Sequence, residues 1–122
     1  MKKRILAVDD NPDALTLLEK ILRREGYDVM VVKDGTAAIE LFNRQTFDLV
    51  LLDIMMPGVD GFEVSRTLRH GSGPGKVPVV FITSKDDAES MREGFRSGGS
   101  VFLSKPFTAI QLTKLVRSLI GG

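Results

Sequence analysis

Five short apolar runs alternate along the chain with longer stretches whose hydrophobic residues recur with the period of an α-helix. Each run has the length of a β-strand, and most are apolar throughout, which is typical of strands covered on both faces of a sheet. The runs are Ile5–Val8, Val29–Val32, Leu49–Leu52, Val77–Ile82 and Val101–Leu103. Five β/α units in series predict an α/β domain with a parallel sheet, right-handed crossovers and helices on both faces.

The stretches between the runs carry signals that begin and end helices. Pro12 suits the first helical position after a cap at Asn11, and Gly26 suits the stop. Asp34 is expected to cap a second helix. The first helix is expected to bury the face formed by Ala14, Leu17, Leu18, Ile21 and Leu22. Three further helices are expected over about 61–70, over about 86–97, and before Gly121 with Leu112, Leu115, Val116 and Leu119 on one face.

Length, charge and cysteine content exclude several classes of protein. The 122 residues fit one domain, expected over 1–122, and a net charge of +1 creates no field that would attract nucleic acid or an anionic membrane. The absence of Cys excludes a disulfide framework, a thiolate zinc site and a cysteine nucleophile. No apolar run approaches the roughly 20 residues that cross a bilayer, and the apolar stretch after Met1–Arg4 is too short for a signal peptide. A soluble, cytoplasmic domain is therefore expected.

Polar side chains close four of the five expected strands. Asp9 and Asp10 follow the first strand, Asp53 the third, Thr83 the fourth and Lys105 the fifth. Ligands of such sheets bind outside the carboxyl ends of the strands, so these side chains are expected to converge at one edge. Taken singly, each has an ordinary role: a helix cap for an Asp, a strand end for the Thr, a solvated side chain for the Lys. Their combination in this order predicts a site.

Three carboxylates at one edge repel one another, and a single ammonium group does not balance them. A divalent cation with oxygen ligands would do so, and Mg²⁺ commonly completes its coordination with phosphate oxygens. A carboxylate can also attack phosphorus and form an aspartyl-phosphate. The metal, the ammonium group and the hydroxyl would then stabilise the phosphoryl oxygens.

Four segments resemble the receiver domain of bacterial two-component response regulators. They are Ile5–Pro12 (ILAVDDNP), Asp48–Gly61 (DLVLLDIMMPGVDG), Pro78–Ser84 (PVVFITS) and Gly98–Phe107 (GGSVFLSKPF). The acid pair, the Asp-x-x-Met-Pro-x-x-Asp-Gly motif and Lys-Pro-Phe stand in the order and spacing of that family. The resemblance implies a flavodoxin-like, doubly wound, five-stranded parallel sheet with strand order 2-1-3-4-5 and five helices on its two faces.

The resemblance also implies the chemistry of the site. Asp53 resembles the phosphoacceptor, which takes a phosphoryl group from a histidine kinase or a histidine phosphotransfer protein. Asp10 and Asp53 resemble direct ligands of Mg²⁺, for which Mn²⁺ can substitute, and Asp9 resembles a residue that acts largely through water. The backbone carbonyl of Met55 resembles the remaining protein ligand of the metal.

Further residues resemble the parts of the family that sense the phosphoryl group. Lys105 resembles the phosphoryl-contacting lysine, and Thr83 resembles the hydroxyl that moves towards the phosphoryl group. Phe102 occupies the place of the aromatic residue that turns inward when Thr83 is recruited. The face of the fourth helix, fifth strand and fifth helix would then change its binding of partners. Residues that resemble structural parts of the site are Pro57, Gly61 and Pro106.

The chain is therefore expected to be a phosphoacceptor switch of a phosphorelay, with no substrate turnover beyond its own phosphoryl group. It is expected to be a monomer or a weak phosphorylation-dependent dimer, to serve an unidentified effector, and to contact neither nucleic acid nor membrane directly. A receiver domain cut from a hybrid kinase or from a DNA-binding regulator remains an alternative.

Other functions fit the residues less well. A haloacid-dehalogenase-like phosphohydrolase needs a second acid two residues after its nucleophile, but Met55 follows Asp53 there, and Asn11 follows Asp9. A flavin carrier needs a first loop that binds phosphate, and the acids after the first strand would repel one. A receiver-like domain that no longer takes a phosphoryl group would be expected to lack a site residue, and none is missing.

Three features depart from the family pattern. Gly98–Val101 stands where many relatives have a small residue followed by acids, and Phe102 lacks the hydroxyl of the more common tyrosine. Gly71–Gly75 is a glycine-rich insertion with no following Lys-Ser/Thr pair, so a connector is expected there rather than a phosphate loop.

Overall fold

The computed structural model describes residues 2–53, 63–64, 66–67, 77–83 and 101–121. Its five strands form one parallel sheet in the order β2-β1-β3-β4-β5. The strands are β1 (Arg4–Val8), β2 (Asp28–Val32), β3 (Leu49–Asp53), β4 (Val79–Thr83) and β5 (Val101–Ser104). This confirms the predicted doubly wound sheet and its strand order.

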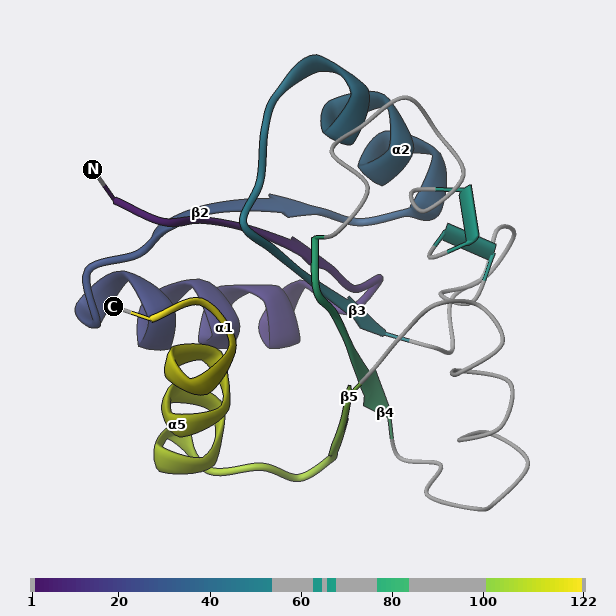
Figure 1. The fold of residues 1–122 in the computed structure, drawn as a ribbon. Helices are drawn as coiled ribbons and strands as arrows, with labels where there is room; N and C mark the ends of the chain where they lie inside the picture. Colours follow the sequence, from purple (N-terminus) through teal and green to yellow (C-terminus); the bar gives the residue numbers. More distant parts are fainter. Residues whose placement is uncertain (1, 54–62, 65, 68–76, 84–100, 122) are drawn as a thin grey trace.

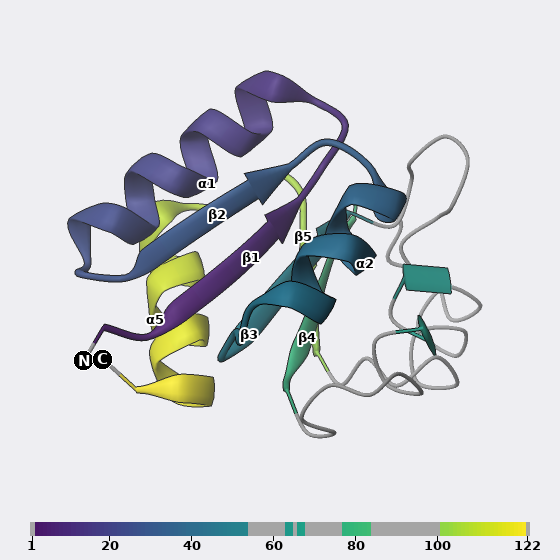
Figure 2. The ribbon, with the colours of Figure 1, turned by 90° about the horizontal axis from the view of Figure 1, so that it is seen from above.

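The described residues contain three complete helices, which cover both faces of the sheet (Figures 1 and 2). The helices are α1 (Pro12–Arg24), α2 (Gly35–Arg44) and α5 (Ala109–Ile120). α1 and α5 lie on one face and α2 lies on the other (Figure 1). Of the helices expected over about 61–70 and 86–97, residues 63–64 and 66–67 are helical, and the rest lies outside the described residues.

Side-chain caps fix where the helices begin. The Asn11 side chain accepts hydrogen bonds from the backbone N–H groups of Asp13 and Ala14 at the start of α1. The Asp34 carboxylate accepts one from the Ala37 N–H at 2.7 Å. Each cap satisfies N–H groups that have no partner within the helix. Both predicted caps are confirmed, and α1 and α2 therefore begin at the carboxyl edge of the sheet.

The core has two layers, one on each face of the sheet. The layer under α1 and α5 is closed by Leu112 and Val116 from α5, both fully buried. The layer under α2 contains Ala38, Phe42 and Phe81. All five residues of β3 are buried because this central strand has neighbours on both sides and helices on both faces. The sheet is therefore held rigidly at the edge where β1 and β3 end.

The buried face of α1 differs from the sequence prediction. Leu17, expected to be buried, is 50% exposed, whereas Leu15, which was not expected, is 4% exposed. Leu18 and Leu22 are buried as predicted. Apolar residues on α1 cover more than one stripe, so the periodicity alone does not settle which stripe faces the sheet. Packing against the sheet selects the stripe of Leu15, Leu18 and Leu22 and leaves Leu17 near the carboxyl edge.

β4 begins at Val79 rather than at Val77, where the apolar run starts. Pro78 lies between them and has no N–H group to donate to a neighbouring strand. Its carbonyl still accepts a hydrogen bond from the Val50 N–H at 3.0 Å. The strand continues to Thr83, one residue past the predicted end.

The end of α5 is fixed to the turn between α1 and β2. The Tyr27 hydroxyl, on a side chain that is 3% exposed, donates a hydrogen bond to the Gly121 carbonyl at 2.5 Å. Arg117 pairs with Glu25 at 2.9 Å in the same region. These contacts hold the C-terminal end of α5 alongside α1.

Candidate functional site

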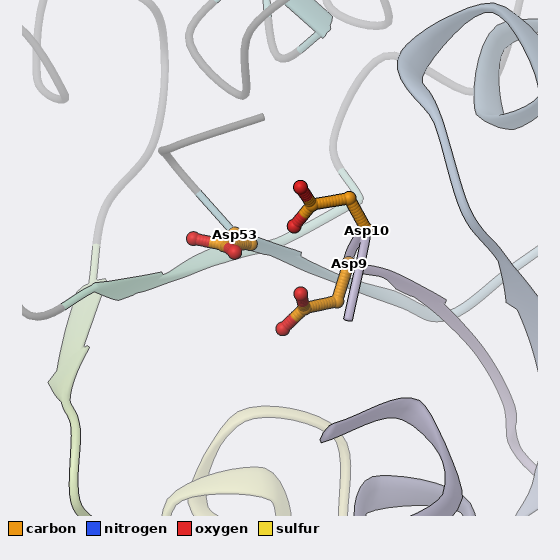
Figure 3. Close-up of side chains that lie close together, drawn as sticks. All are labelled: Asp9, Asp10 and Asp53. Carbon is orange, nitrogen blue, oxygen red and sulfur yellow. The ribbon is translucent and has the colours of Figure 1, made fainter. Parts of the chain in front are cut away.

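Three carboxylates meet at the carboxyl edge of the sheet. Asp9 and Asp10 follow β1, and Asp53 ends β3, which is the direct neighbour of β1 in the sheet. One oxygen of each carboxylate lies within 4.8 Å of the others. Figure 3 shows the three side chains gathered at the ends of these two strands. Asp9 and Asp53 are buried, at 1% and 7% exposure, whereas Asp10 is exposed to solvent.

Lys105 brings a positive charge to this cluster from the loop after β5. Its Nζ lies 3.1 Å from Asp9 Oδ2 and 3.6 Å from Asp53 Oδ2. Burial by itself lowers the pKa of Lys105, but the hydrogen bond to Asp9 and the charges of Asp53 and Asp9 outweigh it. The pKa is therefore raised above the ordinary lysine value of 10.5. The ammonium group remains charged at neutral pH.

The two acids after β1 have different surroundings. Asp9 Oδ1 accepts a hydrogen bond from the Asn11 N–H at 2.9 Å, and Asp9 Oδ2 accepts one from Lys105. Within the described residues, Asp10 makes no hydrogen bond or ion pair. Asp9 is therefore held by the protein on both oxygens, while the Asp10 carboxylate is open to a ligand from solvent.

The donor set fits a hard divalent cation. Three carboxylates and one ammonium group leave about two uncompensated negative charges at the cluster, and magnesium prefers carboxylate and water oxygens. Asp10 and Asp53 would hold the ion, with Asp9 beside them. Met55, whose carbonyl was expected to be a further ligand, lies outside the described residues, as do Pro57 and Gly61.

A pocket of about 470 Å³ opens beside Asp9 and Lys105. Its wall is mainly apolar, and it lies between the first turns of α1 and the loop that joins β5 to α5. The apolar lining residues are Ala14, Leu17, Leu18, Ile82, Pro106 and Phe107. The sequence analysis did not identify this pocket, because it forms between segments far apart in the chain. The local signal that could have indicated it is that the apolar residues of α1 cover more than one stripe, so that Leu17 is left outside the face that packs on the sheet.

The remaining predicted residues lie on β4 and β5 or directly after them. Thr83 ends β4 in register with Ser104 of β5. Phe102 of β5 is half-buried and packs against the core under α2, where its ring contacts that of Phe81. Pro106 follows Lys105 after a cis peptide bond. The sheet thus brings Lys105 to Asp9 and Asp53, and the end of β4 lies beside the end of β3.

Residues 5–117 match the family model for the response regulator receiver domain. The chain belongs to this family. Receiver domains are signalling switches of two-component systems, they bind Mg²⁺ in an acidic pocket, and they interact with histidine kinases and effectors. This receiver domain has a cluster of three aspartates at the carboxyl edge of its sheet.

Proteins related in sequence are longer than this receiver domain. It is 42% identical over 118 residues to the DNA-binding response regulator MtrA of Mycolicibacterium smegmatis, covering 97% of this chain and 50% of MtrA. It is 43% identical over 119 residues to the response regulator PleD of Caulobacter vibrioides, covering 98% of this chain and 26% of PleD. The chain therefore spans about half the length of the mycobacterial relative.

Solved structures share the fold over nearly the whole receiver domain. The Vibrio cholerae chemotaxis protein CheY4 has a TM-score of 0.94 and 28% identity, covering 98% of this chain and 99% of CheY4. The receiver domain of the Pseudomonas aeruginosa sensor histidine kinase PA1611, solved with a magnesium ion in its active site cleft, has a TM-score of 0.91 and 31% identity over the full length of both chains. None of the helices in the described part of this receiver domain has the length and hydropathy needed to cross a bilayer.

Proposed function

We propose that this receiver domain accepts a phosphoryl group on Asp53 from a phosphohistidine donor and acts as a switch in a two-component pathway. The observation that carries the proposal is the juxtaposition of Asp53 with Asp9, Asp10 and Lys105 at one sheet edge. Asp53 is 7% exposed, so its carboxylate is held by the end of β3 and still reaches the surface of the molecule. A nucleophile fixed in this way meets a donor without a large loss of side-chain entropy.

In the proposed step, a carboxylate oxygen of Asp53 attacks phosphorus and an O–P bond forms. The N–P bond of the donor breaks, its electron pair returns to the imidazole nitrogen, and that nitrogen takes up a proton from solvent. The Lys105 ammonium group, 3.6 Å from Asp53 in the structure, pairs with a phosphoryl oxygen as negative charge accumulates there. Thr83, at the end of β4, supplies a hydroxyl to the product.

We propose that Asp10 and Asp53 hold Mg²⁺ directly and that Asp9 acts on it through water. Asp9 supports this division of roles, because both of its oxygens already accept hydrogen bonds from the protein. When bound, the ion supplies positive charge for the phosphoryl oxygens, which is the main contribution of metals to phosphoryl transfer. Mn²⁺ has the same preference for carboxylate and water oxygens and is expected to replace it.

The apolar pocket beside the cluster is the proposed binding site for the donor protein. Leu17 is 50% exposed on its wall, and Pro106 lies on the opposite side next to Lys105. A helix carrying the phosphohistidine could bury an apolar side chain there while its imidazole faces Asp53. The domain would then gain and lose one phosphoryl group, with no other substrate turned over.

A mass measurement tests the proposed phosphoacceptor. The protein is incubated with a small acyl phosphate and Mg²⁺, and its intact mass is compared with that of Asp53→Asn. One phosphoryl adduct is expected on the parent chain and none on the variant. Chelation of Mg²⁺ is expected to suppress the adduct.

Asp34→Asn is the matched control, because Asp34 follows β2 at the same edge of the sheet but caps α2 instead of joining the cluster. Asparagine is as good a cap as aspartate, so this variant is expected to carry the adduct as the parent does. An adduct of equal size on Asp53→Asn, or none on the parent chain, would exclude Asp53 as the phosphoacceptor.

A further inference from the structure

Phe81 and Phe102 form a ring pair on the α2 side of the sheet. The two residues stand opposite each other in the parallel register of β4 and β5. Their ring centroids are 5.3 Å apart, and the ring planes are tilted by 34°. Phe81 is completely buried, whereas Phe102 is half-buried and packs against the same core layer. Val101 and Leu103, the neighbours of Phe102 on β5, pack into the other layer under α1 and α5.

We propose that Phe81 is a positioning residue of the switch, whose ring holds the ring of Phe102 against the core in the unphosphorylated protein. The inference rests on the proposed function and on the resemblance of Phe102 to the switch aromatic residue, whose inward position phosphorylation favours. The further claim is that Phe102 already occupies the inward position before phosphorylation and that Phe81 stabilises this position.

The chemistry of the two side chains supports a ring that is held before any signal arrives. Phe102 has no hydroxyl, so no polar atom at its tip gains a hydrogen bond by turning to solvent. An offset or tilted pair of rings at this separation is more favourable than the burial of the same apolar area alone. Turning Phe102 outward would lose that pair and expose apolar surface beside the fully buried Phe81.

The position of Phe81 links this pair to the phosphoryl site. Phe81 lies two residues before Thr83, the last residue of β4. Phe102 therefore stands beside the strand whose last residue is the proposed phosphoryl-sensing hydroxyl. If phosphorylation favours the inward ring, a residue that populates this ring position in advance also favours phosphorylation.

Fluorine NMR of the protein labelled with 4-fluorophenylalanine can follow the ring directly. The chain has seven Phe residues, and the Phe102 resonance is identified by its loss in Phe102→Leu. Spectra are compared for the parent chain, Phe81→Leu and Phe42→Leu before and after treatment with acyl phosphate and Mg²⁺. Phe42→Leu is the matched control, because Phe42 is 5% exposed in the same core layer and stacks on Phe47 at 6.3 Å, in a separate ring pair.

The ratio of packed to outward Phe102 rings is expected to fall by about 2- to 12-fold in Phe81→Leu, the factor that corresponds to the energy of one aromatic pair. Its resonance should move towards the position of an exposed ring, and phosphorylation should move it back. In the parent chain and in Phe42→Leu, phosphorylation should shift this resonance little. An unchanged Phe102 resonance in Phe81→Leu, or a large phosphorylation shift in the parent chain, would overturn the proposal.

The same samples separate failure of this inference from failure of the proposed function. Intact mass reports whether Asp53 carries the phosphoryl group, independently of where Phe102 lies. Without an adduct, the unphosphorylated spectra of Phe81→Leu and Phe42→Leu still decide whether Phe81 holds the ring. If Phe81→Leu does not fold, Phe81→Met, which keeps an apolar side chain without the ring, replaces it in the same comparison.

Discussion

Replacing Asp10 by Asn is expected to stabilise the metal-free protein. The carboxylate of Asp10 lies within 4.8 Å of those of Asp9 and Asp53, and the described residues give it no hydrogen bond or ion pair. Two unit charges at that distance repel by about 0.9 kcal/mol in the dielectric of water, which suits the exposed Asp10. The two buried neighbours together therefore disfavour the Asp10 charge by about 1.7 kcal/mol.

Lys105 offsets part of this repulsion, because its ammonium group pairs with the two buried carboxylates. The net gain expected for Asp10→Asn is about 1 kcal/mol. With a urea m-value typical of small domains, the unfolding midpoint should rise by about 0.5 M. The gain should shrink at high salt, because screening weakens interactions of the exposed charge.

Magnesium should reverse the order of stability. The ion binds the folded parent chain and stabilises it by mass action, whereas Asp10→Asn has lost a proposed ligand and should gain less. The assay is urea unfolding in low salt, once with a chelator and once with Mg²⁺. Asp34→Asn is the control, since Asn preserves its cap and the residue lies outside the cluster.

Two results would refute this reasoning. If Asp10→Asn were less stable than the parent chain in chelator, the exposed carboxylate would be attracted rather than repelled by its surroundings. If Asp34→Asn rose as much as Asp10→Asn, the gain would reflect net charge and not the cluster.

Three further predictions concern stability. The Lys105→Gln variant should unfold more easily than the parent chain below pH 10.5. This difference in unfolding free energy should vanish as the pH rises through the raised folded-state pKa of Lys105. A difference that grows at high pH would contradict the pairing of Lys105 with the carboxylates. Leu18→Ala should lower the free energy of unfolding, measured in denaturant, by about 2–5 kcal/mol because Leu18 is buried, whereas Leu17→Ala should lower it by less than about 1 kcal/mol. Equal losses of stability would mean that the wrong face of α1 had been identified as buried. Tyr27→Phe should cost about 1 kcal/mol and speed amide exchange in the last turn of α5, because the Gly121 carbonyl loses its donor; unchanged exchange there would show that this hydrogen bond does not hold the helix end.

Local sequence signals predicted the strands and the helix starts well. Asn11 and Asp34 are caps in the structure, as their positions before helical periods indicated. β4 was predicted from an apolar run that begins at Val77, but the strand begins at Val79 because Pro78 cannot donate to the ladder. These features depend on a few neighbouring residues, and such signals are visible in the chain itself.

The convergence of the site residues also followed from the sequence, given one rule of topology. Because parallel strands end at a common edge, Asp9 and Asp53 were expected to meet, and β1 and β3 are indeed neighbours. The pairing of Lys105 with both buried carboxylates needed the structure, because it depends on where the loop after β5 lies relative to β1 and β3.

The sequence by itself determined the α/β alternation, the caps and the set of residues at the carboxyl edge, since these follow from periodicity and from residues adjacent in the chain. Only the tertiary structure decided that α1 buries Leu15 and exposes Leu17, that Lys105 pairs with Asp9 as well as Asp53, and that Phe81 lies against Phe102. The physical reason is that such contacts depend on differences of a few ångströms between distant segments. Those separations are set by the packing of both core layers at once.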